Sequence, residues 1–253
     1  MTEPLRQGIF TTAKRYPVIV RLSTAPGDLQ SDRSAALDGM AIKVLGVIGN
    51  KVLSKNEGHN QDFLLVNHPV MPFGNVAAYW AFQQMMEKLA ESSSANQPAT
   101  TEKPSDAASM LPASLRAVAA VPYSHILGES FHSMAALRFG SYVAKLSAAP
   151  LSESVRSLTG TSVPDTDSAV RDLVVDFFRN HSAEYELRAQ LLTDLEQMPV
   201  EDASVLWPET AYGRGRSSST TSERSCSRSR TTSRPSAETS KSRMLNSGAK
   251  LVS

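Results

Sequence analysis

Three short runs in the first third of the chain alternate apolar and polar side chains with the two-residue period of a β-strand. In the run 17–23, Val18, Val20 and Leu22 fall on one side of the strand. Arg21 and Ser23 fall on the other side, together with the aliphatic Ile19. Because successive side chains of a strand point to opposite faces, the pattern predicts a strand with one packed side and a cation on the opposite side.

Two more strands are predicted over 40–47 and 61–66, and turn-forming residues separate all three runs. Strands joined by turns, without helices between them, favour an antiparallel sheet over alternating strand–helix units. In the third run, Asn67 falls on the side of Phe63 and Leu65. A guanidinium and a carboxamide among apolar strand residues suit the fixing of one end of a largely apolar ligand.

A helix is predicted directly after this group of strands. Asn75 can cap its first turn, and four large apolar residues follow at helical spacing, namely Tyr79, Phe82, Met86 and Leu89. The remaining predicted elements are a mobile linker over about 92–106, a short helix over 107–121, strands over 125–133 and 141–148, a helix over 168–178 and a strand over 184–191. In the last strand polar and apolar residues alternate from Glu184 to Leu191, so its polar side is expected to face water.

The chain changes character after Glu209. Residues 213–243 contain 11 Ser, five Thr and seven Arg, without an aromatic, Leu, Ile, Val or Met residue. Such a composition buries too little apolar surface to offset ordering costs of about 1–2 kcal/mol per residue, so a disordered tail is expected over 211–253, behind a domain over 1–210. One hypothesis for the break is translation out of frame after about residue 210. A minor alternative is RNA binding through the arginines, although no aromatic stacking partners accompany them.

Composition limits the partners, the covalent cross-links and the cellular compartment that we expect for the protein. The net charge of +1 and the hydrophobic content of 41% are ordinary for a globular chain and point to no particular partner. The single cysteine, Cys226, excludes an intramolecular disulfide. The first 20 residues lack a secretory signal pattern, and no run approaches the roughly 18 apolar residues of a membrane span, so a cytoplasmic protein is expected. The five histidines show no compact ligand spacing, so no metal site is predicted from side chains alone.

Several stretches resemble the haem-catalase superfamily, in particular its short bacterial "catalase family" branch. The resemblance covers residues 3–209 in order and implies an α+β fold, a catalase-like antiparallel β-barrel with flanking helices. It also implies a haem cofactor, the decomposition of hydrogen peroxide or an organic peroxide, and assembly as a homo-oligomer. The stretches are RLST at 21–24, DGMAIKV at 38–44, QDFLLVNHPV at 61–70, SHILGESFHSMAALRFGSYVAKLS at 124–147, and the segment from VRDLVVDFF at 170 to WPE at 207–209.

The resemblance assigns roles to five residues. As the catalytic residue, Asn67 orients the peroxide, while Arg21 pairs with a haem propionate and Ser23 supports a catalytic histidine. Phe63 and Phe73 pack against the porphyrin. Each of these residues also has a structural alternative. Arg21 can pair with a nearby aspartate, Ser23 can satisfy the backbone, and Asn67 can end a strand before a turn. Phe63 and Phe73 can be ordinary core residues.

This sequence departs from the family pattern in three places. It has no histidine before the RLST strand and no R-x-x-x-Y element after WPE, which in the family supplies the tyrosinate ligand of the iron. The usual Arg-Gly pair at the second strand is replaced by Leu37-Asp38 before Gly39. We therefore expect a copy truncated at both ends that binds haem weakly and turns over little, with an inactive remnant of the catalase scaffold as the alternative reading.

Overall fold

The fold is described by a computed structural model, which covers residues 3–25, 31–32, 37–49, 51, 58–94, 123–208, 212–221 and 249–252. The predicted helix over 107–121 and most of the predicted linker lie outside these described residues. The remaining predictions fall largely inside them.

The three strands predicted first are all present. β1 (Arg15–Thr24), β2 (Asp38–Leu45) and β3 (Asn60–Val66) form antiparallel neighbours in that order. Their register aligns apolar residues across the strands, for example Ile42 opposite Phe63. Directly opposed side chains lie on the same face of a sheet, so the alternation in each strand adds up to one continuous apolar surface.

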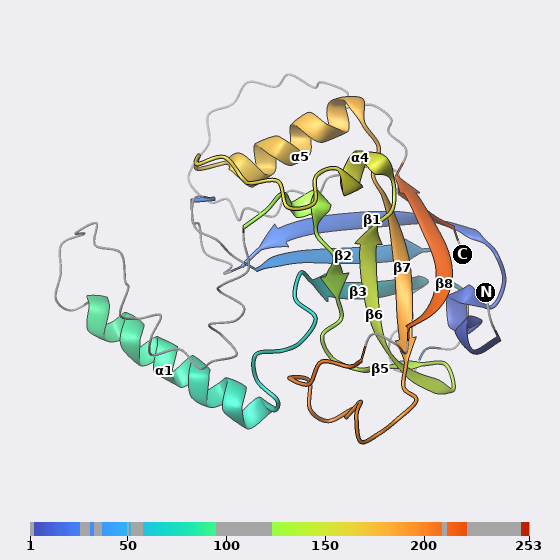
Figure 1. The fold of residues 1–253 in the computed structure, drawn as a ribbon, viewed down its shortest axis with the longest axis horizontal. Coiled ribbons are helices and arrows are strands. Elements are labelled where there is room, and N and C mark those ends of the chain that lie inside the picture. The colour runs from blue at the N-terminus through green and yellow to red at the C-terminus, as the bar shows by residue number, and fades with distance from the viewer. Residues whose placement is uncertain are drawn as a thin grey trace.

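The second half of the sheet is built from the later segments of the chain (Figure 1). The strand predicted over 125–133 is present only at its end, because residues 126–128 form the 3-10 helix η3 (Ile126–Gly128), which His125 caps by accepting the Leu127 N–H. The other two predicted strands are confirmed. The later strands are β4 (Phe131–His132), β5 (Leu137–Phe139), β6 (Tyr142–Pro150), β7 (Glu184–Leu191), β8 (Tyr212–Thr221) and β9 (Ala249–Val252).

The described strands form one nine-stranded antiparallel sheet in the order β4-β3-β2-β1-β9-β8-β7-β6-β5. β4 pairs with β6 as well, so the sheet curves strongly around its core. The joins at β4 are narrow, with one residue pair to β3 and two to β6. We describe the fold as a curved antiparallel sheet of the α+β class, which corrects the closed barrel predicted from the sequence.

Most of the predicted disordered tail over 211–253 lies outside the described residues, and only two short parts of it are described. β8 and β9 fall within the residues for which composition predicts disorder, and they pair with β7 and β1 through their backbones. Backbone pairing does not depend on side-chain type, so a segment poor in apolar residues can still supply two strands between β1 and β7.

The helices differ in how they lie relative to the sheet (Figure 1). α1 (Val76–Ser94) extends away from the sheet, and the Asn75 side chain caps it as predicted by accepting the Ala78 N–H at 2.9 Å. α4 (Glu153–Arg156) and α5 (Ala169–Asn180) lie over one end of the strands, and α5 buries Val170, Val174 and Phe177. Two 3-10 turns, η1 (Glu3–Leu5) and η2 (Gly8–Phe10), begin the described chain. Among the described helices, none has both the length and the apolar character needed to cross a membrane.

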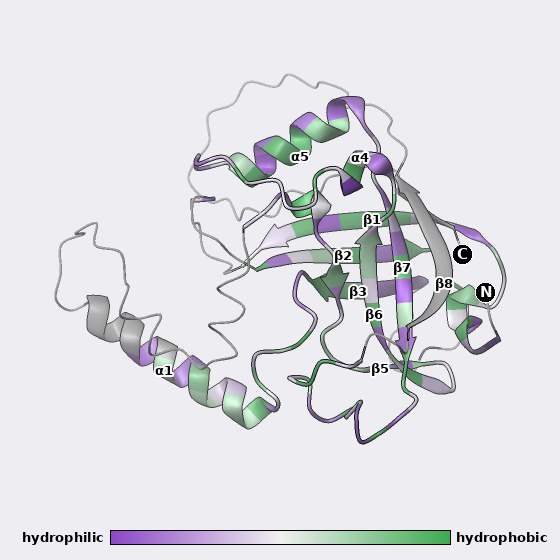
Figure 2. Ribbon diagram, viewed as in Figure 1, coloured by the Kyte–Doolittle hydropathy of each residue, from purple (hydrophilic) through white to green (hydrophobic). Residues whose placement is uncertain are grey.

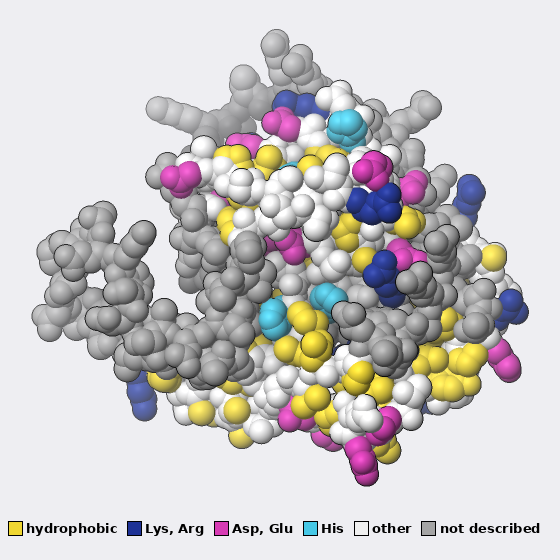
Figure 3. Space-filling view, viewed as in Figure 1, with side chains coloured by type: hydrophobic (Ala, Val, Ile, Leu, Met, Phe, Trp, Pro, Cys, Tyr) yellow, Lys and Arg dark blue, Asp and Glu magenta, His cyan; other side chains and the backbone are white. Residues whose placement is uncertain are grey.

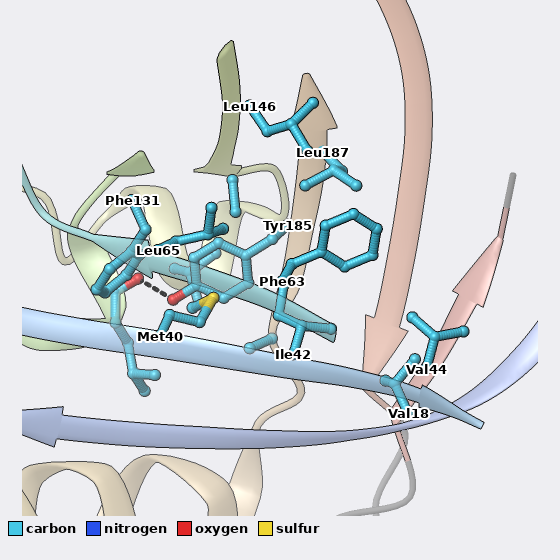
Figure 4. Packing of buried hydrophobic residues seen from close by; sticks show 14 of the residues in the cluster. Val18, Met40, Ile42, Val44, Phe63, Leu65, Phe131, Leu146, Tyr185 and Leu187 are labelled. Carbon is cyan, nitrogen blue, oxygen red and sulfur yellow. Dashed lines mark hydrogen bonds between the residues drawn. The ribbon is translucent and has the colours of Figure 1, made fainter. Parts of the chain in front are cut away.

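The apolar core lies on the inner face of the curved sheet (Figure 4), and hydrophobic and hydrophilic residues follow one another along β1 and β7 (Figure 2). Met40 and Leu65 pair across β2 and β3, while Leu187 approaches from β7 on the other side of the core. Tyr185 lies among them and donates its hydroxyl to the Leu127 carbonyl at 2.5 Å, so its one polar atom is satisfied. The core residues touch one another closely, and this face of the sheet is filled by the protein's own side chains.

The side of β7 that the sequence predicts to be wet is instead mostly covered. Glu186 and Gln190 are buried, with Gln190 only 2% exposed, whereas Arg188 is exposed. The segment 192–208, which we call the strap, lies over Gln190, whose amide donates to the Pro208 carbonyl of the strap at 2.7 Å. A two-residue period shows which side chains share a face, but it does not show whether another segment covers that face.

Candidate functional site

One row of residues crosses the outer face of the sheet, the face opposite the apolar core. The register places these residues side by side on six strands, and the row runs from an open region on β1–β3 to a partly covered region on β6 and β7. The row consists of Ser23, Gly39, Val66, His132, Ser147 and Arg188.

The β1–β3 end of this row borders side chains that are open to solvent. Arg21, Ala41 and Leu64 form the next row, in which Arg21 is exposed and Leu64 is 73% exposed. Gly39 lies under the Ser23 hydroxyl, because a Cβ added there would come within 2.8 Å of that oxygen. We call these residues, Arg21, Ser23, Gly39, Ala41 and Leu64, the open strip. It combines small, apolar and cationic groups on one plane.

The β6–β7 end is polar and covered by the strap. Lys145 is 8% exposed, donates to the Val205 carbonyl at 3.0 Å, and places its ammonium 5.1 Å from the centre of the Trp207 ring. Trp207 is 1% exposed and donates its indole N–H to the Pro199 carbonyl. Burial lowers the pKa of Lys145, and the charge of Asp202 acts in the opposite direction. These contacts fix the strap on the sheet.

His132 lies between the two ends of the row, and Figure 3 shows two histidine side chains close together on this face. Burial first, and then the charges of His68, Arg188 and Lys145, lower the pKa of His132 to about 4. His132 is therefore neutral at pH 7. His68 bonds through its Nδ1 to the Val70 carbonyl at 2.7 Å.

Asn67 lies at the inner side of the sheet, at the end of β3. Its side-chain oxygen accepts the backbone N–H of Asp38 at 2.9 Å, and its own N–H donates to the Asp38 carbonyl at 2.9 Å. These two bonds extend the β2–β3 ladder by one pair. In this structure the carboxamide oxygen of Asn67 therefore links the end of β3 to the backbone of β2.

The structure distributes the five residues assigned by resemblance over three places. Arg21 and Ser23 share the outer face, as the alternation predicts. Phe63 is buried on the inner face, where its ring lies 6.4 Å from that of Phe10. Phe73 packs at the start of α1, with its ring 4.9 Å from that of Phe82. Arg21 and Ser23 are thus brought together, while Asn67, Phe63 and Phe73 do not join them around one cavity.

A group of acids was missed by sequence reasoning. Asp38 is 1% exposed on the inner side of β2, and burial, followed by the charges of Glu129 and Asp32, raises its pKa to about 7. Glu129 accepts a hydrogen bond from the Ser124 hydroxyl. The signal was available in the alternation itself, because Asp38 stands in phase with the apolar Met40 and Ile42.

The residues of the open strip suit a haem-like group only in part. Apolar and small side chains with an adjacent guanidinium fit a planar ligand that carries a carboxylate. The strip offers no group that we assign as an iron ligand. Within the described residues, no cluster of three or more His, Cys, Asp or Glu side chains is arranged to hold a metal ion.

Comparison with known proteins points to one fold. No family model and no curated protein matches the chain. A fungal catalase superposes with a TM-score of 0.55 at 19% identity, over 85% of this chain and 45% of that one. Catalase A from Saccharomyces cerevisiae gives 0.48 at 11% identity (95% and 49% covered), and a bacterial catalase gives 0.44 at 8% (94% and 47%).

The likeness to the fungal catalase shows a catalase-like fold. It does not distinguish the short bacterial branch from other catalases. The chain spans about half the length of the solved catalases that it matches.

Proposed function

We propose that the protein takes part in the haem-dependent decomposition of hydrogen peroxide or an organic peroxide, with the open strip as the wall against which the haem lies. The observation that carries the proposal is the position of Arg21 and Ser23 on one exposed face with Ala41 and Leu64, on a catalase-like fold. A bound haem supplies redox chemistry on peroxide oxygen that side chains lack.

The residues of the open strip have separate roles in this proposal. Arg21 pairs its guanidinium with a propionate carboxylate, and Leu64 packs against the porphyrin plane, which removes an exposed leucine from water. Gly39 has no side chain and Ala41 has only a methyl group, so a planar ligand can approach the backbone at the centre of the strip. Ser23 offers a hydroxyl at the edge of that ligand.

A second candidate function, a non-catalytic catalase-like scaffold, is favoured by one specific observation. The oxygen of Asn67, the residue expected to orient peroxide, is already bonded to the Asp38 N–H on the opposite side of the sheet from Arg21. In this reading the strip still binds a planar ligand, but peroxide is not turned over. We propose a homo-oligomer in either case.

Haemin titration of the full chain, followed by absorption spectroscopy, tests the binding step. We expect Arg21→Gln to weaken haemin binding about twofold to fivefold, since an exposed ion pair contributes roughly 0.2–1 kcal/mol. Leu64→Asp is expected to weaken it more, because it places a like charge beside the propionates. Arg179→Gln, at an exposed arginine on α5 paired with Asp176, is the matched control and should leave binding unchanged.

Oxygen release from hydrogen peroxide separates the two candidate functions. Sustained release by the haemin-loaded chain, reduced in Arg21→Gln, supports the first. Binding without release supports the scaffold. Binding that is equal in all variants would show that haemin does not use the open strip, and the proposal would then be wrong.

A further inference from the structure

Asp38 is an acid placed inside the core without a partner for one of its oxygens. It opens β2 on the inner side, in phase with Met40, and is 1% exposed. Its Oδ1 has no hydrogen-bond partner. A buried carboxylate in this state is costly unless it gains a counter-charge or a proton.

The charged groups around Asp38 do not supply that counter-charge. Glu129, which follows η3, and Asp32, which precedes β2, are both acids, and their charges add to the effect of burial on the Asp38 carboxyl. Tyr123 stays neutral, because burial first and then Asp38 and Asp32 raise its pKa to about 12. His125 also stays neutral at pH 7, since burial lowers its pKa.

These acids connect the sheet to the segments that cover its end. We call residues 123–129 together with α5 the cap. Asp32 accepts the Val170 N–H of α5 at 3.0 Å through its side chain, and Glu129 accepts the Ser124 hydroxyl. The α5 residue Val170 is itself buried against the core. A charge on Asp38 therefore repels the two acids, Asp32 and Glu129, that make these contacts.

We propose that a proton on Asp38 holds the cap against the end of the sheet, and that its loss as the pH rises through neutrality loosens the cap. The proposal is independent of haem. A metal ion is a poorer solution for the missing charge, because no cluster of three or more acid, histidine or cysteine ligands is formed by the described residues. The two bonds between Asp38 and Asn67 use the backbone N–H and carbonyl of Asp38, so its carboxyl group takes no part in them.

The direction of the pH effect follows from the raised pKa of Asp38. The pKa of Asp38 is about 7 in the folded chain against an ordinary value of 3.8. Between these values the folded protein holds a proton that the unfolded chain has lost, so stability falls as the pH rises through this window. Above it, the folded and unfolded chains are both ionised and the loss is complete.

Thermal unfolding of the full chain at pH 5 and pH 8 tests the proposal, with Asp38→Asn as a neutral mimic of the protonated acid. Wild type is expected to lose stability between the two pH values, while the variant loses much less and has an unfolding equilibrium constant at pH 8 about tenfold lower or more. Asp62→Asn, at an exposed acid of β3, is the control, and its loss of stability between pH 5 and pH 8 should equal that of wild type. Glu129→Gln is a second variant, expected to reduce the slope in part.

Hydrogen exchange locates the effect. Amides of α5, corrected for the intrinsic pH dependence of exchange, are expected to lose protection between pH 6 and pH 8 in wild type and to keep it in Asp38→Asn. An unchanged slope in Asp38→Asn, or loss of protection spread evenly over all strands, overturns the proposal. So does a rise in stability at pH 8 specific to calcium over sodium at matched ionic strength, because that result assigns the missing charge to a metal ion.

Discussion

The two halves of the outer face have the same sheet geometry but different surroundings. On β1–β3, Leu64 is 73% exposed and Arg21 points to solvent. On β6 and β7, Lys145 and Gln190 occupy equivalent outward positions and are almost fully buried beneath the strap. Polar residues are thus the more buried set on this face, the reverse of what their chemistry alone indicates.

The difference shows how the strap meets the cost of burying polar groups. Each buried polar group beneath it has a partner: Lys145 reaches the Val205 carbonyl, and Gln190 reaches the Pro208 carbonyl. A buried polar group that is bonded is tolerated, while one that loses its partner is costly. The open half needs no such partners, and this leaves its residues available for a ligand.

The largest effect is expected at the anchor of the strap. Trp207→Ala removes a ring that is 1% exposed and packs against the Lys145 ammonium, so it should lower the free energy of unfolding by about 3–5 kcal/mol. Urea denaturation measures the loss. Trp80→Ala, at a tryptophan of α1 that is 62% exposed, is the control and should stay within about 0.5 kcal/mol. Equal losses in the two variants would contradict a fixed strap.

Adjacent leucines of β3 test the difference between the two faces of one strand. Leu65→Ala opens a cavity in the core and is expected to cost about 2–5 kcal/mol, because Leu65 is 3% exposed. Leu64→Ala is expected to change stability by about 0.5 kcal/mol or less. The same denaturation measurement applies. A large loss for Leu64→Ala would mean that the open strip is covered in solution.

The polar half can be tested at a single hydrogen bond. Gln190→Met removes the donor to the Pro208 carbonyl at nearly constant volume and is expected to cost about 1–3 kcal/mol. Gln61→Met is matched to it, since the exposed Gln61 amide also donates to a backbone carbonyl, that of Asp62, at 3.0 Å. That variant should cost about 0.5 kcal/mol or less. If the two losses are the same, burial under the strap does not determine the strength of the bond.

Much of the fold could be predicted from the sequence. The two-residue period located β1, β2, β3 and β7, because each has one face in the core. The Asn75 cap and the apolar spacing after it located α1. The two-residue period wrongly predicted a strand at residues 126–128, which form a buried 3-10 helix. It also could not predict the pairing of β4 with β3 and β6, because this pairing depends on contacts between distant segments.

Less of the candidate site could be predicted. Alternation placed Arg21 and Ser23 together correctly, since both lie on the same strand. It could not show that Asn67 faces the opposite side of the sheet from them, because that depends on how β3 is turned against β1 through β2. The acid at Asp38 was readable as a departure from the apolar phase of β2, but its missing partner depends on the cap, which a local pattern does not describe.

The smallest expected effect is at the outer edge of the open half. Lys43 bonds both carboxylate oxygens of Asp62, at 2.8 and 3.0 Å, and each side chain is nearly half exposed. Burial alone raises the pKa of Asp62, but the bonds from Lys43 and Asn60 outweigh it and lower the pKa below 3.8. At pH values above the ordinary pKa of 3.8, the ion pair therefore stabilises the folded chain. This stabilisation is lost as the pH falls through the pKa of Asp62 in the folded chain.

Asp62→Asn is expected to cost about 0.2–1 kcal/mol at pH 7 in urea denaturation, and less at about 1 M salt. This change in the free energy of unfolding is opposite in sign to that of Asp38→Asn, which stabilises the protein at pH 8. The two variants therefore distinguish an exposed acid that is paired with a lysine from a buried acid that needs a proton. If Asp62→Asn is equally costly at low and high salt, the loss does not come from the ion pair.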